Sequence, residues 1–155
     1  MIESIITVTN ADKKHKDSFS MPERLEKIEF ISLNKDGRKQ IAAQSNSGMH
    51  YTNLAIYGYE NGKLYKIFED GSACGVDTYF NDSPPLIKVG RANWEQKGWC
   101  YADEPLWAVY KWNGNKFVFD EKLSNVTEIS EQEEIQRFMD KAKSLMKEED
   151  KYQEP

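Results

Sequence analysis

The fold is decided by the stretch Asn53-Leu54-Ala55-Ile56-Tyr57-Gly58-Tyr59-Glu60-Asn61-Gly62-Lys63-Leu64-Tyr65-Lys66-Ile67-Phe68. Both of its arms are rich in aliphatic and aromatic residues that favour β-strands, and the pair Asn61-Gly62 separates them. Asn and Gly adopt positive φ at low cost, as the two central residues of a tight hairpin turn must. The stretch therefore predicts a β-hairpin with strands over residues 53–59 and 63–68.

The same signals recur on both sides of this hairpin. Asp36-Gly37 and Asn113-Gly114 are further turn pairs, and each lies between runs of β-forming residues. The other predicted strands cover residues 2–8, 28–33, 40–44, 86–89, 106–112 and 116–119. Short strands joined by tight turns are typical of an antiparallel meander, so we expect a β core over residues 27–120.

Three stretches lie outside this core. Residues 10–26 are polar and rich in lysine, and we expect them to form a loop or arm. Ser130 and Glu133 form a capping box, which predicts a helix over residues 130–148 that begins near Glu131. The helix carries apolar side chains at helical spacing, namely Ile135, Phe138, Met139, Ala142, Leu145 and Met146. The charged residues 149–155 are expected to be a frayed tail.

These segments predict a single, mainly β domain over residues 1–155, built from an antiparallel meander and one C-terminal amphipathic helix. The expected position of the helix is on one face of the sheet, where its apolar stripe would be buried. A helix that binds a partner is the alternative.

The composition limits the classes of function. Hydrophobic residues make up 39% of the 155 residues, and no apolar run approaches the roughly 18 residues that a membrane-spanning helix needs. The net charge is −5, which repels nucleic acids. We therefore expect neither membrane insertion nor nucleic-acid binding. The N-terminal residues carry no secretory signal, which leaves a cytoplasmic protein or an exported domain whose signal peptide was removed.

Two hairpins of similar sequence indicate an internal repeat. Residues 54–64 and 106–117 both consist of a strand with an aliphatic-Tyr pair, an aromatic residue, an Asn-Gly turn and a hydrophobic return strand. Such a repeat suggests a duplicated unit. Any two hairpins that share an Asn-Gly turn also look alike, so coincidence is the alternative interpretation.

The segment over residues 30–42 crosses between two strands through a polar turn that contains Asp36-Gly37. Over residues 27–120 the chain resembles the FG-GAP and VCBS-type repeats of integrin-like β-propellers. The resemblance implies two blade-like hairpin units of antiparallel sheet, and a binding or scaffolding role, usually outside the cytoplasm. A closed propeller needs about four or more blades, which this chain is too short to supply. The chain would then form an open two-unit sheet, or several chains would complete a ring.

In that family the polar loop binds calcium through oxygen ligands at alternate positions. Carried over, the ligand positions fall on Ser32, Asn34, Asp36, the backbone carbonyl of Arg38, and Gln40. Asp36 is the only acid among them, and basic side chains surround it. We therefore interpret the loop as a structural turn that has lost its metal, and we expect no metal and no cofactor.

The sequence gives little support to catalysis. His15 and His50 are the only histidines, and neither Cys74 nor Cys100 lies in a known nucleophile motif. A small enzyme that uses Cys74 with His50 is one alternative, since a Cys-His pair forms a nucleophile. A structural cysteine or half-cystine is the favoured interpretation, so an enzyme is the less expected class.

Aromatic residues give the leading hypothesis for function. All four tryptophans lie within residues 94–112, and the polar segment around Trp94 and Trp99 predicts a loop. Exposed Trp and Tyr rings stack on sugars and anchor protein interfaces. We therefore assign Trp94, Trp99 and Tyr101 as ligand-binding residues of a non-catalytic recognition or scaffolding module whose partner is a protein or a glycan. A structural subunit of a homo-oligomer is a further alternative.

Overall fold

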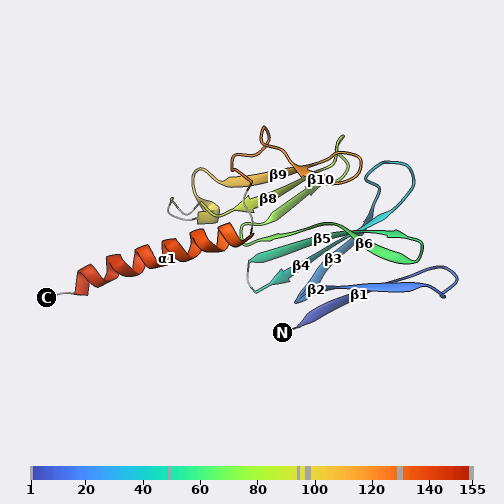
Figure 1. The fold of residues 1–155 in the computed structure, drawn as a ribbon, viewed down its shortest axis with the longest axis horizontal. Coiled ribbons are helices and arrows are strands. Elements are labelled where there is room, and N and C mark those ends of the chain that lie inside the picture. The colour runs from blue at the N-terminus through green and yellow to red at the C-terminus, as the bar shows by residue number, and fades with distance from the viewer. Residues whose placement is uncertain (1, 49, 94, 97–98, 129–130, 154–155) are drawn as a thin grey trace.

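The described residues form three stacked antiparallel sheets and one α-helix (Figure 1). The computed structural model describes residues 2–48, 50–93, 95–96, 99–128 and 131–153. The strands are β1 (Glu3–Thr9), β2 (Lys16–Pro22), β3 (Arg24–Ile31), β4 (Gln40–Ser47), β5 (Tyr51–Glu60), β6 (Lys63–Ser72), β7 (Val76–Tyr79), β8 (Leu86–Arg91), β9 (Leu106–Trp112) and β10 (Phe117–Phe119). The sheet orders are β1-β2, β3-β4-β5-β6 and β10-β9-β8-β7. The fold is therefore mainly β and antiparallel with a single C-terminal helix, as the sequence predicts.

The middle sheet, β3 to β6, is buried on both faces at its central strands. Alternate side chains of a strand point to opposite faces. Ile41, Ala43 and Ala55 pack against the β1–β2 hairpin, whereas Leu54 and Ile56 pack against the β7–β10 sheet. Sheets that are covered on both sides carry continuous apolar runs rather than an alternating pattern. The runs in β4 and β5 fit this description.

Two apolar cores hold the layers together. The larger core lies between the two four-stranded sheets and consists of Ile31, Leu33, Ala42, Leu54, Ile56, Ile87, Val89, Trp112 and Phe117. The smaller core lies beneath the β1–β2 hairpin and consists of Ile6, Phe19, Met21, Ile41, Ala43 and Ala55. The ring of Phe19 stacks on the ring of Tyr57, with 4.1 Å between the ring centroids.

The turn predictions are confirmed. Asn61-Gly62 joins β5 directly to β6, with φ of 52° at Asn61 and 79° at Gly62. Positive φ at both central residues is the geometry of a type I′ turn. Asp36-Gly37 lies between β3 and β4, and Asn113-Gly114 lies between β9 and β10.

The β3–β4 loop, which carries the candidate calcium ligands, links the middle sheet to the β7–β10 sheet. The side-chain oxygen of Asn34 accepts a hydrogen bond from the indole Nε1–H of Trp112 at 2.8 Å. Oε1 of Gln40 accepts the backbone N–H of Leu33 at 2.9 Å, and Oδ1 of Asp36 accepts the N–H two residues further on at 3.0 Å. Three of the oxygens in the candidate ligand set are thus used in hydrogen bonds within the protein.

The prediction that residues 10–26 form a loop or arm is wrong. Lys16–Pro22 is strand β2, which pairs with β1 along its whole length, and β3 already begins at Arg24. Phe19 and Met21 alternate with serines, and both are almost fully buried. This period of two residues marks a strand, but the many lysines around it obscured the pattern. Strand β7 was also not foreseen.

Helix α1 (Glu131–Gln153) begins where the sequence predicts, although Ser130 of the expected capping box lies outside the described residues. The expected frayed tail is wrong for residues 149–153, because the helix continues to Gln153. No Gly or Pro occurs between Glu131 and Pro155, so the sequence carries no helix-breaking residue that would end the helix earlier.

The position of the helix also differs from the expectation. It extends away from the sheets (Figure 1), and its larger apolar side chains, Ile135, Phe138, Met139, Leu145 and Met146, are 43% to 59% exposed. The central strands of the middle sheet, β4 and β5, are already covered on both faces by other strands, so the stripe does not pack there. Ile135 and Phe138, in the first turns, line a groove with residues of the sheets. In the described residues, α1 does not combine the length and apolar character that crossing a bilayer requires.

We expect Leu54→Ala to destabilise the protein by about 2–5 kcal/mol, because it leaves a cavity between two sheets. Leu54 is 0% exposed. The matched control Leu123→Ala removes the same atoms from a side chain that is 48% exposed, and it should cost less than about 1 kcal/mol. Urea unfolding followed by circular dichroism measures both. Equal losses would contradict the burial of Leu54 between the two four-stranded sheets.

Acid should weaken the contact between the β1–β2 hairpin and β6. The carboxylate of Asp17 accepts the backbone N–H of Leu64 at 2.8 Å, and hydrogen bonds from Leu64 and Ser18 lower the pKa of Asp17. A lowered pKa stabilises the fold above the ordinary carboxyl pKa of about 3.9, and that contribution is lost as the pH falls through the lower value. The Leu64 amide resonance should therefore titrate below pH ~3.9 in NMR spectra. In Asp17→Asn this transition should vanish; its persistence would assign it to another group.

Candidate functional site

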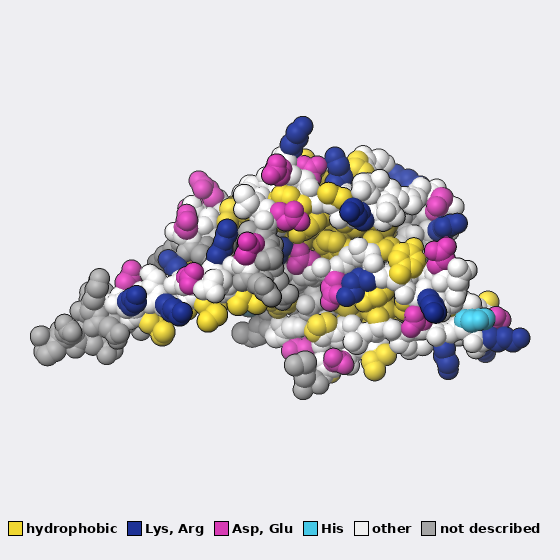
Figure 2. Space-filling view, in the orientation of Figure 1, with side chains coloured by type: hydrophobic (Ala, Val, Ile, Leu, Met, Phe, Trp, Pro, Cys, Tyr) yellow, Lys and Arg dark blue, Asp and Glu magenta, His cyan; other side chains and the backbone are white. Residues whose placement is uncertain are grey.

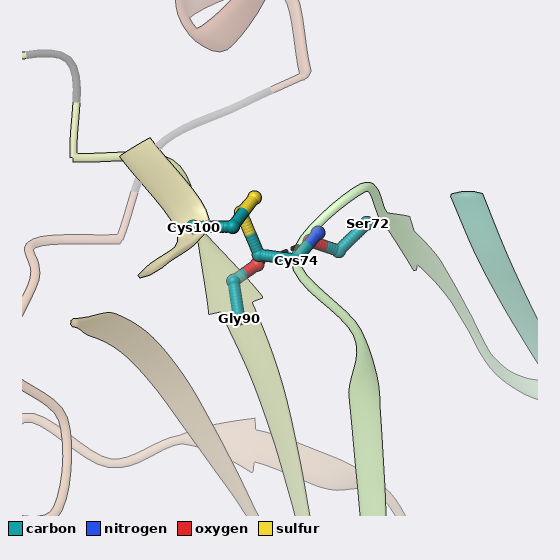
Figure 3. The surroundings of a disulfide bond; sticks show 4 residues. All are labelled: Ser72, Cys74, Gly90 and Cys100. Atoms are coloured by element: carbon teal, nitrogen blue, oxygen red, sulfur yellow. Dashed lines mark hydrogen bonds between the residues drawn. A yellow bond between two sulfur atoms is a disulfide. The ribbon is translucent and has the colours of Figure 1, made fainter. Parts of the chain in front are cut away.

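A disulfide joins two segments at the end of the sheets (Figure 3). Cys74 lies in the turn between β6 and β7, and Cys100 lies in the short 3-10 helix η1 (Trp99–Tyr101). Their Cα atoms are 5.0 Å apart, although 26 residues separate them in the sequence. The bond attaches the loop between β8 and β9, which carries Trp99 and Tyr101 and is called the aromatic loop, to the edge of the sheets.

Close packing against β8 fixes the position of Cys74. The Ser72 hydroxyl accepts the backbone N–H of Cys74 at 2.9 Å and donates to the carbonyl of Gly90. A Cβ on Gly90 would lie 2.5 Å from the carbonyl oxygen of Cys74, which is too close for any other residue without a shift of the backbone. The turn that carries Cys74 is therefore fixed by Ser72 and by the small size of Gly90.

Asn93 shapes the aromatic loop from inside. Its side chain is 8% exposed, and Nδ2 donates to the carbonyl of Glu104 at 3.1 Å. Its Oδ1 accepts the backbone N–H of Glu95 at 3.3 Å, and its own N–H donates to the carbonyl of Trp99 at 3.4 Å. Trp99 has a φ of 46°, a left-handed conformation that a large side chain rarely adopts. Such conformations are concentrated at binding and active sites.

The structure places the predicted aromatic residues in three different situations. Trp99 is 44% exposed and Tyr101 is 88% exposed, one on each side of Cys100. Trp94 lies outside the described residues. Trp112 is core, and Trp107 is half-buried with the ammonium of Lys88 3.5 Å from its ring centroid. Two of the three assigned site residues are thus presented on one turn.

An apolar groove of about 400 Å³ lies beside this turn. Its lining combines five segments that are far apart in the sequence: Tyr51, Gly71, Ser72, Ala73, Cys74, Ala92, Trp99, Cys100, Ile135 and Phe138. Trp99 was predicted as a site residue, whereas Tyr51, Ile135 and Phe138 were not. The only sequence signal for the helix residues is that Ile135 and Phe138 begin the apolar stripe of α1.

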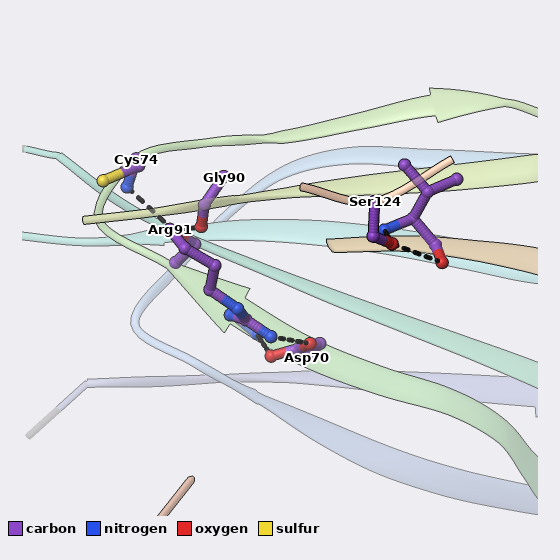
Figure 4. A network of polar contacts seen from close by, with 8 residues as sticks. Asp70, Cys74, Gly90, Arg91 and Ser124 are labelled. Carbon is purple, nitrogen blue, oxygen red and sulfur yellow. Dashed lines mark hydrogen bonds and ion pairs between the residues drawn. The ribbon is translucent and has the colours of Figure 1, made fainter. Parts of the chain in front are cut away.

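A polar pocket of about 460 Å³ adjoins the groove and shares Tyr51 and Gly71 with it. Nη2 of Arg91 lies 2.9 Å from Oδ2 of Asp70, and their side chains are 10% and 23% exposed (Figure 4). Burial, followed by the charge of Asp70, raises the pKa of Tyr110, which also lines the pocket. Tyr110 is therefore a neutral phenol at physiological pH, and a base is not available from it.

The alternative enzyme hypothesis loses its nucleophile in this structure. Cys74 is bonded to Cys100, so it has no free thiol, and His50 lies on an exposed turn. Within the described part of the chain, no three His, Cys, Asp or Glu side chains are grouped so that they could hold a metal ion.

No protein-family model, curated protein or solved structure matches this chain.

Replacing both cysteines, as Cys74→Ala with Cys100→Ala, should lower the free energy of unfolding by about 2–4 kcal/mol. Residues around Cys100 should also become more sensitive to proteases, because the loop loses its attachment to the sheets. Urea unfolding and limited proteolysis with mass spectrometry measure the two effects. Unchanged stability and unchanged cleavage would show that the packing of Asn93 alone fixes the loop.

Proposed function

We propose that this protein is a non-catalytic recognition module that binds a protein partner through its aromatic loop and the adjacent apolar groove. The observation that carries the proposal is the position of Trp99 and Tyr101. Both rings are exposed, they flank a disulfide-bonded cysteine, and Trp99 also lines the groove. Aromatic side chains of this kind are the usual anchors of protein interfaces.

The chemistry of the groove favours a protein over a glycan. Sugar recognition needs polar side chains that pair with hydroxyl groups, in addition to a stacked ring. The polar hydroxyl of Ser72 in the lining is already used by Cys74 and Gly90, and the remaining surface is largely alkyl and aromatic. An apolar side chain of a partner fits this lining best.

The surface continues from the groove along the helix. Phe138 lines the groove, and Met139, Leu145 and Met146 follow it on α1 with exposures of 43% to 59%. Figure 2 shows hydrophobic side chains along the helix beyond the sheets. A partner that inserts an anchor in the groove would therefore also find apolar contacts on α1, and burying them contributes about 25 cal/mol per Å².

Rigidity of the aromatic loop supports binding. A side chain that is already ordered loses little conformational entropy when it is buried in an interface. The disulfide and the hydrogen bond from Asn93 to Trp99 restrict residues 99–101 before a partner arrives, and the tight packing at Gly90 fixes Cys74 at the other end of the disulfide. This restriction is most useful for a binding surface.

The disulfide and the stacked four-stranded sheets also support the predicted resemblance to FG-GAP and VCBS-type repeats and a location outside the cytoplasm. Disulfides persist in oxidising compartments and are rare in the cytosol. The orders β3-β4-β5-β6 and β7-β8-β9-β10 follow the chain, as in blade-like units. The resemblance remains part of the proposal.

The proposal is tested with peptides selected from a random display library against the intact protein. The selected peptides should be rich in Leu, Phe or Trp, and Trp99→Ala or Phe138→Ala should weaken their binding at least about tenfold in calorimetry. The matched control is Tyr79→Ala, since Tyr79 is 42% exposed on β7 and does not line the groove. Equal affinity of all variants would show that the groove is not the binding surface.

A further inference from the structure

The cover on one face of the middle sheet ends between β4 and β3. Ile41 and Ala43 of β4 are 4% and 0% exposed beneath the β1–β2 hairpin. Their direct cross-strand neighbours on β3, Phe30 and Ile28, are 69% and 42% exposed. Paired residues of neighbouring strands share a face, so the same apolar layer continues past its cover.

The size of the hairpin explains where the cover ends. The β1–β2 sheet has two strands and the middle sheet has four. β2 reaches across to β6, where Asp17 accepts the backbone N–H of Leu64, whereas β1 lies at β3, where Ser4 Oγ accepts the backbone N–H of Leu25. The uncovered apolar side chains therefore lie on the side of β1 that faces away from β2.

On that side β1 has a free edge without the usual protection. Sheets avoid unwanted pairing through charges, prolines, bulges or very short edge strands. β1 pairs with β2 without a register shift, its only charged residue is Glu3, and residues 5–9 are all Ile, Thr or Val. Such a strand favours pairing with a further strand.

The outer strands of the two larger sheets are protected against pairing with a further strand. β3 carries several charged residues and a register shift at Leu25/Lys27, and β6 carries charged residues with a shift at Ile56/Tyr57. β7 and β10 have four and three residues. The contrast within one molecule marks the free edge of β1 as the exception.

We propose that the free edge of β1, together with Ile28 and Phe30, binds an extended segment of a partner protein as a third strand of the β1–β2 sheet. Peptides commonly bind to sheet edges in this way, with backbone hydrogen bonds for affinity and alternate side chains for specificity. The segment would place apolar side chains over Ile28 and Phe30 and polar side chains outward.

The geometry favours one added strand from a different protein over a second copy of this chain. The exposed apolar side chains, Ile28 and Phe30, both belong to β3, so the uncovered face is about one strand wide. In a second copy, β1 is already packed through Ile6 on its own middle sheet. That sheet would have to occupy the position that Ile28 and Phe30 hold in the first copy.

This surface is independent of the aromatic loop. It shares no residue with the groove beside Trp99, so the proposed function and this inference succeed or fail separately. Tyr101→Ala is therefore the matched control here, because it removes an exposed ring from the other surface.

The test uses a synthetic nine-residue peptide that alternates valine with threonine, carries a lysine at each end and has blocked termini. Added in millimolar excess to the isotope-labelled protein, it should slow hydrogen exchange at alternate β1 amides and shift the Phe30 ring resonances. A peptide with the same side chains but N-methyl groups along one edge should bind at least about tenfold more weakly, since it lacks backbone donors.

Phe30→Ala should weaken binding of the peptide about tenfold, and Tyr101→Ala should leave it unchanged. No change in β1 exchange at peptide saturation, or equal binding of the N-methylated peptide, would overturn the proposal. Protection of β1 without peptide, together with a dimer mass in sedimentation, would also overturn it in favour of a second copy.

Discussion

The burial of the middle sheet on both faces is the constraint on which the rest of the structure depends. β4 and β5 must supply apolar side chains at consecutive positions, and small ones, Ala42, Ala43 and Ala55, where the neighbouring layers approach. The same constraint explains the position of the helix. Since the hairpin and the β7–β10 sheet occupy both faces at β4 and β5, α1 does not cover these central strands and extends away from the sheets (Figure 1).

The outer faces of the stack are different in character. On the β1–β2 hairpin, Thr7 and Ser18 form a hydrogen-bonded pair of 2.9 Å that is exposed to solvent. On the opposite sheet the ammonium of Lys88 lies over the ring of Trp107. Stacking another sheet on either face would bury these polar groups, at a cost of about 1–3 kcal/mol for each one left without a partner. The two proposed interaction surfaces lie instead at an end and at an edge of the stack.

Local signals in the sequence predicted much of the fold and little of the site. Asn61-Gly62 determines its turn through two neighbouring residues, so it can be recognised without the rest of the chain. The course of residues 10–26 could not be recognised in this way, because Phe19 and Met21 become core residues only when they meet β4 and β5. The helix start was also local, whereas its direction depends on which sheet faces are already covered.

The difference between features that neighbouring residues determine and features that only the folded chain creates is larger at the candidate site. The exposed rings of Trp99 and Tyr101 could be predicted because polar residues precede them in a loop. The groove could not, since its lining comes from five segments between Tyr51 and Phe138 that only the folded chain brings together. Likewise, the pairing of Cys74 with Cys100 depends on β8, where the absence of a side chain at Gly90 allows the turn of Cys74 to approach. A binding surface of this kind is therefore a property of the layered fold, and its aromatic residues alone indicate only where to look for it.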